Sequence, residues 1–190
     1  MNILTRAITT LVAATALASV ATTRLAAQVK AATTVIVVRH AEKATMPADD
    51  PPLSAIGQAR ARDLYEAIRN SGVSAVITTQ YVRTKQTAEP TVAGLSLPTE
   101  VVTATSAATH ARDVAAAVRA HAGQTVLVVG HSNTVPAIIE ALGATRPPPI
   151  CDAEYDNLFI VTIAPDGRAG VIRSKFGTRT PVEANCATMK

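Results

Sequence analysis

The sequence predicts an α/β fold with three layers, in which a mostly parallel sheet has helices on both faces and an antiparallel C-terminal edge hairpin. Strand-like and helix-like segments alternate from residue 33 to residue 142, which is the pattern of parallel strands connected through helices. The strand-like segments are continuous apolar runs, as expected for strands that are buried on both faces. Near the C-terminus, two apolar runs flank the turn signal Pro165-Asp166-Gly167, which predicts the hairpin.

The first part of this alternation contains two strand–helix units. Residues 33–38 are β-branched and aliphatic, which predicts a buried strand. Ser54 can cap a helix that continues to about residue 70, because apolar residues recur behind it at nearly helical spacing. Residues 73–79 form a second apolar strand, and the polar segment 80–89 contains a loop and the start of the next helix.

The second part repeats the pattern and then closes the sheet. Residues 100–103 are a weakly marked strand, followed by an Ala-rich helix over residues 109–121. Residues 125–129 form a strand that leads to a helix at 135–142, with a glycine as its stop. Residues 157–174 contain the two strands of the hairpin, at 157–163 and 170–174.

Composition predicts one domain behind a removable leader. The chain has 190 residues, of which 48% are hydrophobic, and this supports a single domain with a sizeable core over residues 28–190. Residues 1–27 have a short basic start, an uncharged apolar run and small residues, which is the pattern of a secretory signal peptide. The apolar run is short for a membrane span, so cleavage is favoured over a retained anchor. We therefore expect an exported protein, periplasmic or extracellular, that is free of the membrane after cleavage.

The cysteines and the charge fit this location. An even number of cysteines in an exported chain suggests a disulfide between Cys151 and Cys186, with two unpaired thiols as the alternative. Neither cysteine stands in a zinc-ligand spacing, so no metal site is expected. The net charge of +4 is modest and aromatic residues are only 3% of the chain, without a basic stripe. Nucleic acid is therefore not an expected partner.

Four cationic or titratable side chains follow the predicted strands. Arg39 and His40 end the first strand, Arg83 follows the second, and His131 comes directly after Gly130 at the end of another. Because the carboxyl ends of parallel strands share one edge of a sheet, these side chains can meet in one pocket. Two guanidinium groups and two imidazoles suit a dianionic phosphate.

These residues occur in motifs that resemble those of the histidine phosphatase superfamily, which has a phosphoglycerate mutase-like fold. Four motifs occur in the family's order: Arg39-His40-Ala41-Glu42, a helix start over residues 52–59 (PLSAIGQA), an element over residues 79–88 (TQYVRTKQTA) and Gly130-His131. The compact length resembles the small bacterial branch that includes the phosphohistidine phosphatases. The resemblance implies hydrolysis of phosphomonoesters on a small phosphorylated substrate, by a metal-independent enzyme of the histidine acid phosphatase type without a cofactor.

The resemblance also implies a role for each residue of the pocket. His40 matches the nucleophile that carries the phosphoryl group. Arg39, Arg83 and His131 match the residues that bind the phosphate, and His131 is expected to act in catalysis as well.

The general acid is the part of the family pattern that this sequence lacks. Many members carry a Glu or Asp well after the second arginine, but residues 101–107 contain no carboxylate. Glu42 is a candidate for an acid or an orienting residue, while Glu100 and Asp113 flank the gap.

Two other functions remain open at this stage. Without an acid, the chain could be a catalytically weak member that binds phosphate ligands. Alternatively, the segment 130–134 follows a strand and precedes a helix like a nucleophile elbow, with Ser132 as the nucleophile of a serine esterase. However, Thr134 replaces the second glycine of that motif. The remaining histidines, His110 and His121, are predicted to lie on the surface at helix ends.

Overall fold

The computed structural model describes residues 31–181 and residue 186, so the predicted signal peptide lies outside the described residues. The strands are β1 (Thr33–Arg39), β2 (Val73–Thr78), β3 (Thr99–Val101), β4 (Thr125–Gly130), β5 (Asn157–Ile163) and β6 (Ala169–Lys175). The helices are α1 (Ala55–Ile68), α2 (Val82–Leu95), α3 (Ala107–Ala120) and α4 (Val135–Ala141). None of the helices in this part of the chain is long and apolar enough to cross a membrane.

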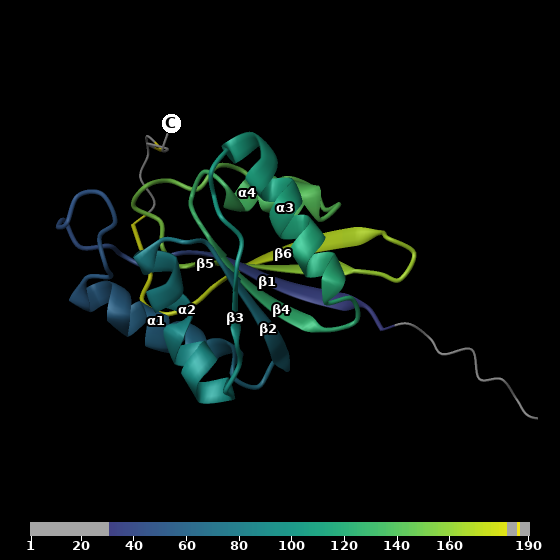
Figure 1. Ribbon diagram of the computed structural model, residues 1–190, viewed down its shortest axis with the longest axis horizontal. Helices are drawn as coiled ribbons and strands as arrows, with labels where there is room; N and C mark the ends of the chain where they lie inside the picture. The colour runs from purple at the N-terminus through teal and green to yellow at the C-terminus, as the bar shows by residue number, and fades with distance from the viewer. Residues whose placement is uncertain (1–30, 182–185, 187–190) are drawn as a thin grey trace, which may run out of the picture.

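The strands form one mixed sheet in the order β3-β2-β4-β1-β5-β6, which confirms the predicted fold class (Figure 1). β1, β2, β3 and β4 are mutually parallel neighbours, whereas β5 runs antiparallel to β1 and β6 antiparallel to β5. The C-terminal hairpin therefore forms the antiparallel edge that the turn signal predicted. Because β5 runs against β1, its N-terminal end lies beside the C-terminal end of β1, where Val38 pairs with Leu158.

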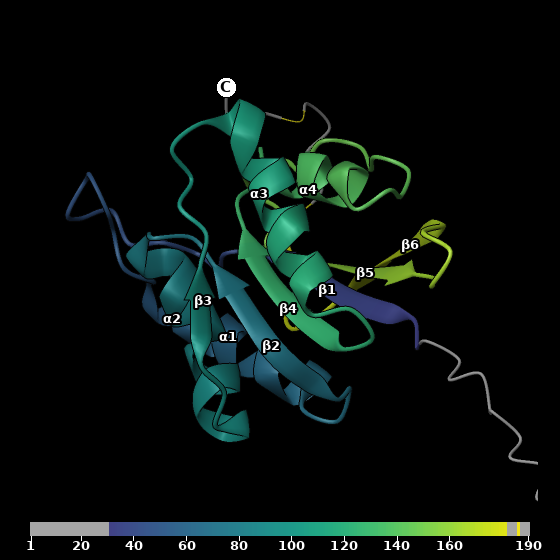
Figure 2. The ribbon, with the colours of Figure 1, turned by 45° about the vertical axis from the view of Figure 1, so that its right-hand side comes forward.

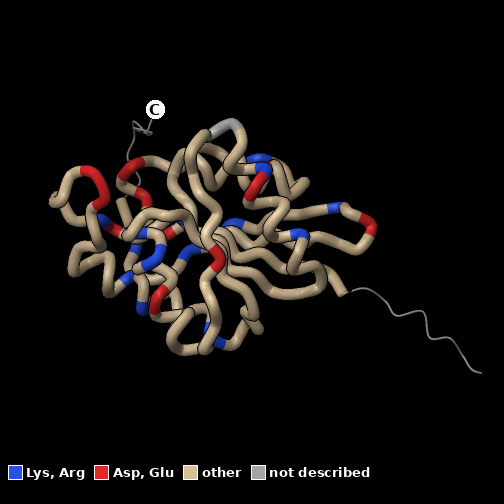
Figure 3. The backbone as a smooth tube through the Cα atoms, viewed as in Figure 1, with Lys and Arg blue, Asp and Glu red and all other residues tan. Residues whose placement is uncertain are grey.

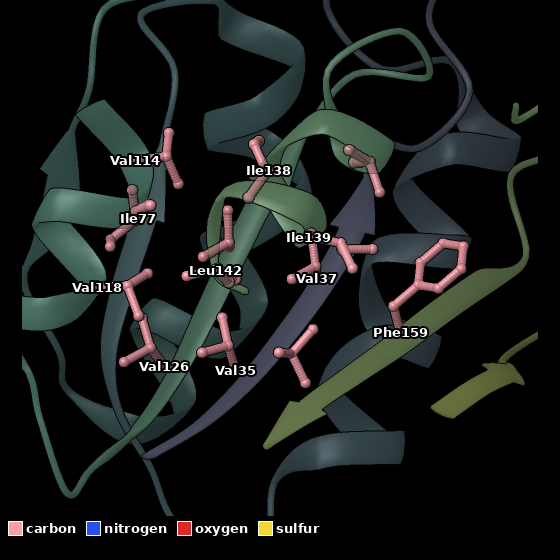
Figure 4. Packing of buried hydrophobic residues seen from close by; sticks show 14 of the residues in the cluster. Val35, Val37, Ile77, Val114, Val118, Val126, Ile138, Ile139, Leu142 and Phe159 are labelled. Carbon is pink, nitrogen blue, oxygen red and sulfur yellow. The ribbon is translucent and has the colours of Figure 1, made fainter. Parts of the chain in front are cut away.

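Each face of the sheet is covered by a pair of helices (Figures 1 and 2). Alternate side chains of β1 lie on opposite faces of the sheet. Val35 and Val37 pack with α3 and α4, whereas Ile36 and Val38 pack with α1 and α2. Figure 4 shows the first of these clusters, in which aliphatic side chains from the helices meet those of the strands. The continuous apolar runs of the sequence thus correspond to strands with two buried faces.

Motif residues also shape the entry to α1. Ser54 caps the helix, because its Oγ accepts a hydrogen bond from the backbone N–H of Gly57 at 3.1 Å. At Gly57, a Cβ atom would collide with the carbonyl oxygen of Glu42. The serine and the glycine of this motif therefore allow α1 to pack closely against the segment that follows His40.

The predicted disulfide is present. Cys151 and Cys186 are bonded, with their Cα atoms 5.0 Å apart. The bond ties the C-terminal tail to the loop that precedes β5, and this loop borders the carboxyl end of β1.

Candidate active site

The pairing of β1 with β4 brings the two predicted site histidines together. Arg39 lies opposite Gly130 in the parallel register, and the backbone N–H of His40 donates to the carbonyl of Gly130 at 2.9 Å. As a result, the rings of His40 and His131 meet edge to face with centroids 5.3 Å apart. Residues separated by about 90 positions thus share one site because their strands are neighbours.

His40 is buried and neutral, with a defined tautomer. Its Nδ1 lies 2.7 Å from the carbonyl oxygen of Ala41, which can only accept a hydrogen bond. Nδ1 therefore carries the proton, and Nε2 carries the lone pair. Burial, followed by the charge of Arg39, lowers the pKa of His40 to about 2. A neutral imidazole with a free Nε2 is the form that a nucleophile requires.

Arg39 is held rigidly by the loop before β5. Its Nη1 donates to the carbonyls of Cys151, Asp152 and Glu154 at 3.1, 2.8 and 3.0 Å. Its guanidinium carbon lies 4.0 Å from the ring centroid of Tyr155. Although burial lowers the pKa of Arg39, an arginine stays charged in proteins. Its buried Nε has no hydrogen-bond partner among the described residues.

Arg83 approaches the site from the first turn of α2. One of its nitrogens lies 3.5 Å from Nδ1 of His131, and the other lies 3.5 Å from the carboxylate of Asp50. The guanidinium carbon also lies 4.2 Å from the ring centroid of Tyr81. Asp50 comes from the loop between β1 and α1, and its carboxylate accepts a hydrogen bond from the backbone N–H of Val82 at 3.1 Å. The acidic part of this loop is visible in Figure 3.

His131 is also neutral. Because Arg83 can only donate, Nδ1 of His131 is the acceptor and Nε2 carries the proton, which it donates to Thr79 Oγ1 at 3.2 Å. Burial and the charge of Arg83 lower the pKa of His131 to about 3. Thr79 is bonded in turn to Thr84 at 2.9 Å. Both threonines belong to the motif over residues 79–88, but the sequence analysis did not predict their position beside His131.

Glu42 forms an ion pair with a residue that the sequence did not single out. Nε of Arg60 donates to both carboxylate oxygens of Glu42 at 2.9 Å, and Nη2 of Arg60 lies 2.7 Å from one of them. Arg60 is buried and its Nη1 donates to the carbonyl of Thr178 at 2.9 Å. Glu42 therefore joins the segment after His40 to α1 and to the C-terminal segment.

The two carboxylates that flank the acid gap lie elsewhere. Glu100 pairs with His121 at 3.1 Å near the C-terminal end of α3, and Asp113 is exposed on α3. A pocket of about 170 Å³ opens beside Arg83 and His131. Among the described residues that line this pocket, none carries a carboxylate.

The prediction that His110 lies on the surface is wrong. This histidine is only 1% exposed and forms part of the wall of the same pocket. The helix α3 begins at residue 107, and His110 lies on the same face as Val114 and Val118, which are buried in the core. Residues 110, 114 and 118 recur every four positions, so the helix places all three on its buried face. His121 is partly exposed.

The geometry gives no support to the serine esterase alternative. Such an enzyme needs a base that accepts a hydrogen bond from the nucleophilic serine. Oγ of Ser132 is buried without a partner among the described residues, and both ring nitrogens of His131 face Thr79 and Arg83 instead.

Comparisons with known proteins agree with this geometry. Residues 35–107 match the histidine phosphatase superfamily, branch 1. No curated protein sequence matches the chain.

Solved structures share the fold at low sequence identity. The protein histidine phosphatase SixA, determined in complex with tungstate, is 21% identical with a TM-score of 0.56; the match covers 77% of this chain and 96% of SixA. A phosphohistidine phosphatase SixA from Nakamurella multipartitia is 24% identical with a TM-score of 0.59, over 80% of this chain and 99% of that protein. A phosphoserine phosphatase from Entamoeba histolytica, in complex with 3-phosphoglyceric acid, is 14% identical with a TM-score of 0.53, over 77% and 97% of the two chains.

These proteins have the phosphoglycerate mutase-like fold that the ordered motifs implied. The matched segment contains three of the four motifs, and the fourth, Gly130-His131, follows β4 beside them. The sequence match and the shared fold together confirm the resemblance of this chain to the histidine phosphatase superfamily.

Proposed function

We propose that this protein is an exported phosphatase that hydrolyses phosphomonoesters through a phosphohistidine on His40. The observation that carries the proposal is the neutral His40, whose Nδ1 donates to the Ala41 carbonyl, while Nε2 has no hydrogen-bond partner among the described residues and lies near Arg39 and Arg83. A nucleophile in this state needs no deprotonation before it attacks.

In the first step, Nε2 of His40 attacks phosphorus and the bond from phosphorus to the leaving oxygen breaks. Arg39 and Arg83 stabilise the negative charge on the equatorial oxygens, because their guanidinium groups carry permanent positive charges. In the second step, water attacks the phosphohistidine, the P–N bond breaks, and phosphate leaves. The proposal assigns charge stabilisation to the two arginines and to His131, so no metal ion is required.

Glu42 is proposed as an orienting residue. Both oxygens of its carboxylate already accept hydrogen bonds from the guanidinium of Arg60. The pair instead fixes the backbone that carries His40.

The exported location has support from the disulfide. A bond between Cys151 and Cys186 is typical of proteins that fold in an oxidising compartment. The proteins of similar fold include a protein histidine phosphatase and a phosphoserine phosphatase. A small phosphorylated molecule is therefore the proposed substrate, and tungstate is expected to inhibit competitively as a phosphate mimic.

The test compares the native protein with His40→Ala on p-nitrophenyl phosphate, with His121→Ala as the control for loss of a histidine outside the site. Labelling with ³²P is measured on protein quenched during turnover. We expect turnover and an acid-labile label in the native protein and in His121→Ala, and neither in His40→Ala. Full activity of a folded His40→Ala variant would end the proposal.

Because the described lining of the pocket contains no carboxylate, a second candidate function is that of a catalytically weak protein that binds phosphate ligands. The same experiment separates the two functions when tungstate binding is measured in parallel by calorimetry. Binding without turnover or label supports the binding protein, whereas turnover with label supports the phosphatase.

A further inference from the structure

The most unusual side chain next to the site is one that the proposed mechanism does not use. His110 is 1% exposed, and neither Nδ1 nor Nε2 has a hydrogen-bond partner among the described residues. The backbone of Thr103 lies close enough to the ring to raise the pKa of His110, although this contact lacks the geometry of a good hydrogen bond. A buried imidazole with both nitrogens unpaired is costly, and such groups in folded proteins usually have a functional reason.

The position of His110 relates this ring to the phosphate site. It lines the pocket that opens beside Arg83 and His131, two of the three groups proposed to hold the phosphate. Ala104 lines the same pocket, and it lies in the segment where the family pattern has its acid and this chain has none. A substrate whose phosphate contacts Arg83 and His131 can therefore place its leaving group in the pocket against His110.

We propose that His110 is the general acid of this enzyme and protonates the leaving oxygen, in place of the missing carboxylic acid. The inference rests on the proposed function and names a further catalytic residue for it. An imidazole can replace a carboxylic acid in this role, because it donates and accepts protons near neutral pH.

The proton balance closes over the two steps. In the first step, protonated His110 gives its proton to the leaving oxygen as the P–O bond breaks, so that an alcohol departs and His40 carries the phosphoryl group. In the second step, water attacks phosphorus and gives one proton to the now neutral His110. Hydrogen phosphate departs, and both histidines return to their starting states.

The surroundings of His110 set the pH at which this exchange operates. The Thr103 backbone and then Asp113 on the same helix favour the charged ring. The other titratable or charged groups among the described residues that line the pocket are His131, Arg83 and Tyr81. The helix packed against α3 carries Glu140, which is exposed and paired with Arg146. Burial lowers the pKa of His110, so its charged form should accumulate on the acid side of neutrality, favoured further by a bound phosphate dianion.

The decisive experiment compares two classes of substrate in His110→Asn, which keeps a polar side chain of similar size but removes the titrating ring. An alkyl phosphate such as glycerol 2-phosphate needs a proton on its leaving oxygen, whereas p-nitrophenyl phosphate does not. We expect kcat/KM for the alkyl phosphate to fall by about 10²–10⁴, the usual contribution of acid catalysis. The value for the aryl phosphate should change by less than about fivefold, and ³²P labelling by the aryl substrate should persist. The native protein should show faster alkyl phosphate turnover as pH falls from 7 to 5.5, and the variant should not.

Two controls separate chemistry from packing. His121→Asn makes the same substitution at the end of the same helix, and Val114→Ala loosens α3 one turn beyond His110. Neither should change the ratio of alkyl to aryl turnover. In addition, imidazole in the buffer should restore alkyl phosphate turnover in His110→Ala.

The outcomes distinguish this inference from the function on which it rests. An equal loss with both substrates, or no loss with either, overturns the role of His110 while labelled His40 keeps the phosphatase intact. A native protein that hydrolyses aryl phosphates alone likewise shows that His110 donates no proton. Absence of label and turnover in the native protein overturns both proposals together.

Discussion

The two arginines of the site are held in opposite ways. Arg39 is 3% exposed, donates from one nitrogen to three carbonyls of the loop before β5, and stacks on Tyr155. Arg83 is partly exposed, stacks on Tyr81, and has two polar contacts that are both 3.5 Å long. One guanidinium is thus fixed before a ligand arrives, whereas the other has weak bonds that a phosphate can replace.

The origin of the difference is the backbone that carries each residue. Arg39 ends a central strand, and the loop that binds it is anchored by the Cys151–Cys186 disulfide. Arg83 lies in the first turn of α2, next to the largely exposed loop that contains Asp50. We infer that the β1 side of the site sets the position of the phosphate, and that the α2 side adapts to the substrate.

The largest expected effect comes from removal of each arginine in turn. Arg39→Ala and Arg83→Ala should each lower kcat/KM by several powers of ten. In the double variant, the loss of transition-state stabilisation should be much smaller than the sum of the two single losses, because the two charges act on one group. Only Arg39→Ala should also destabilise the fold, by about 1–3 kcal/mol or more, because it leaves buried carbonyls without a donor. Kinetics and urea unfolding measure the two effects. Equal stability losses in the two variants would contradict the contrast between a fixed and an adaptable arginine.

A second prediction compares the histidines that the two sides hold neutral. The pKa of His40 is lowered to about 2 and that of His131 to about 3, from an ordinary value of 6.5. Well below pH 6.5, these two histidines therefore bind two more protons in the unfolded chain than in the folded protein, so their contribution to the free energy of unfolding falls as pH falls. The slope should reach about 1.4 kcal/mol per pH unit for each histidine.

This dependence can be assigned residue by residue. Urea unfolding between pH 7 and pH 4.5 should show a smaller slope in His40→Asn and in His131→Asn, each by about one proton. At the same time, aryl phosphate turnover by the folded native protein should not decline between pH 7 and pH 5.5, since His40 stays neutral. A decline in that range with a midpoint near 6.5 would mean that the nucleophile titrates like an ordinary histidine.

The same contrast explains what the sequence could and could not predict. Strand and helix boundaries agree within about two residues where both ends were predicted, because apolar periodicity and the stop residues are local features. His40 and His131 could be brought together because parallel strands share an edge. The hydrogen bonds of Arg39 could not be predicted, because their acceptors are backbone carbonyls of residues 151–154. A pattern of side chains in the sequence does not indicate where a loop places its backbone.

Other parts of the site were hidden by residue type. His110 was assigned to the surface although it shares a helical stripe with Val114, and the partner of Glu42 was missed because Arg60 appeared as one of several charges on α1. In both cases a polar side chain was expected to be solvated. The structure places each of these two polar residues in a buried position beside the functional elements, where the usual relation between polarity and exposure fails.

A third prediction addresses the disulfide that anchors the Arg39 side. Replacing Cys151 and Cys186 by serine should lower the free energy of unfolding by about 2–4 kcal/mol. Because the Cys151 carbonyl accepts a hydrogen bond from Arg39, kcat should also fall, while the contacts of Arg83 are unaffected. The native protein should show no titratable thiol when it is denatured without a reductant. Two free thiols in protein isolated from its native compartment would show that Cys151 and Cys186 are not bonded there.

The smallest expected effect is on the Arg83 side, where the carboxylate of Asp50 competes with phosphate for the guanidinium. Asp50→Asn keeps an oxygen that can accept from the N–H of Val82 but removes the negative charge. Stability should change by less than about 1 kcal/mol, because the ion pair is long and partly exposed. Tungstate and phosphate should bind a few-fold more tightly, and the gain should shrink as salt increases, because exposed charges are screened. Asp49→Asn is the matched control, since it removes the same charge from the adjacent exposed residue. An equal gain in both variants would show that the net charge of the loop acts on the phosphate, whereas a gain confined to Asp50→Asn shows that this carboxylate holds Arg83 back until the phosphate arrives.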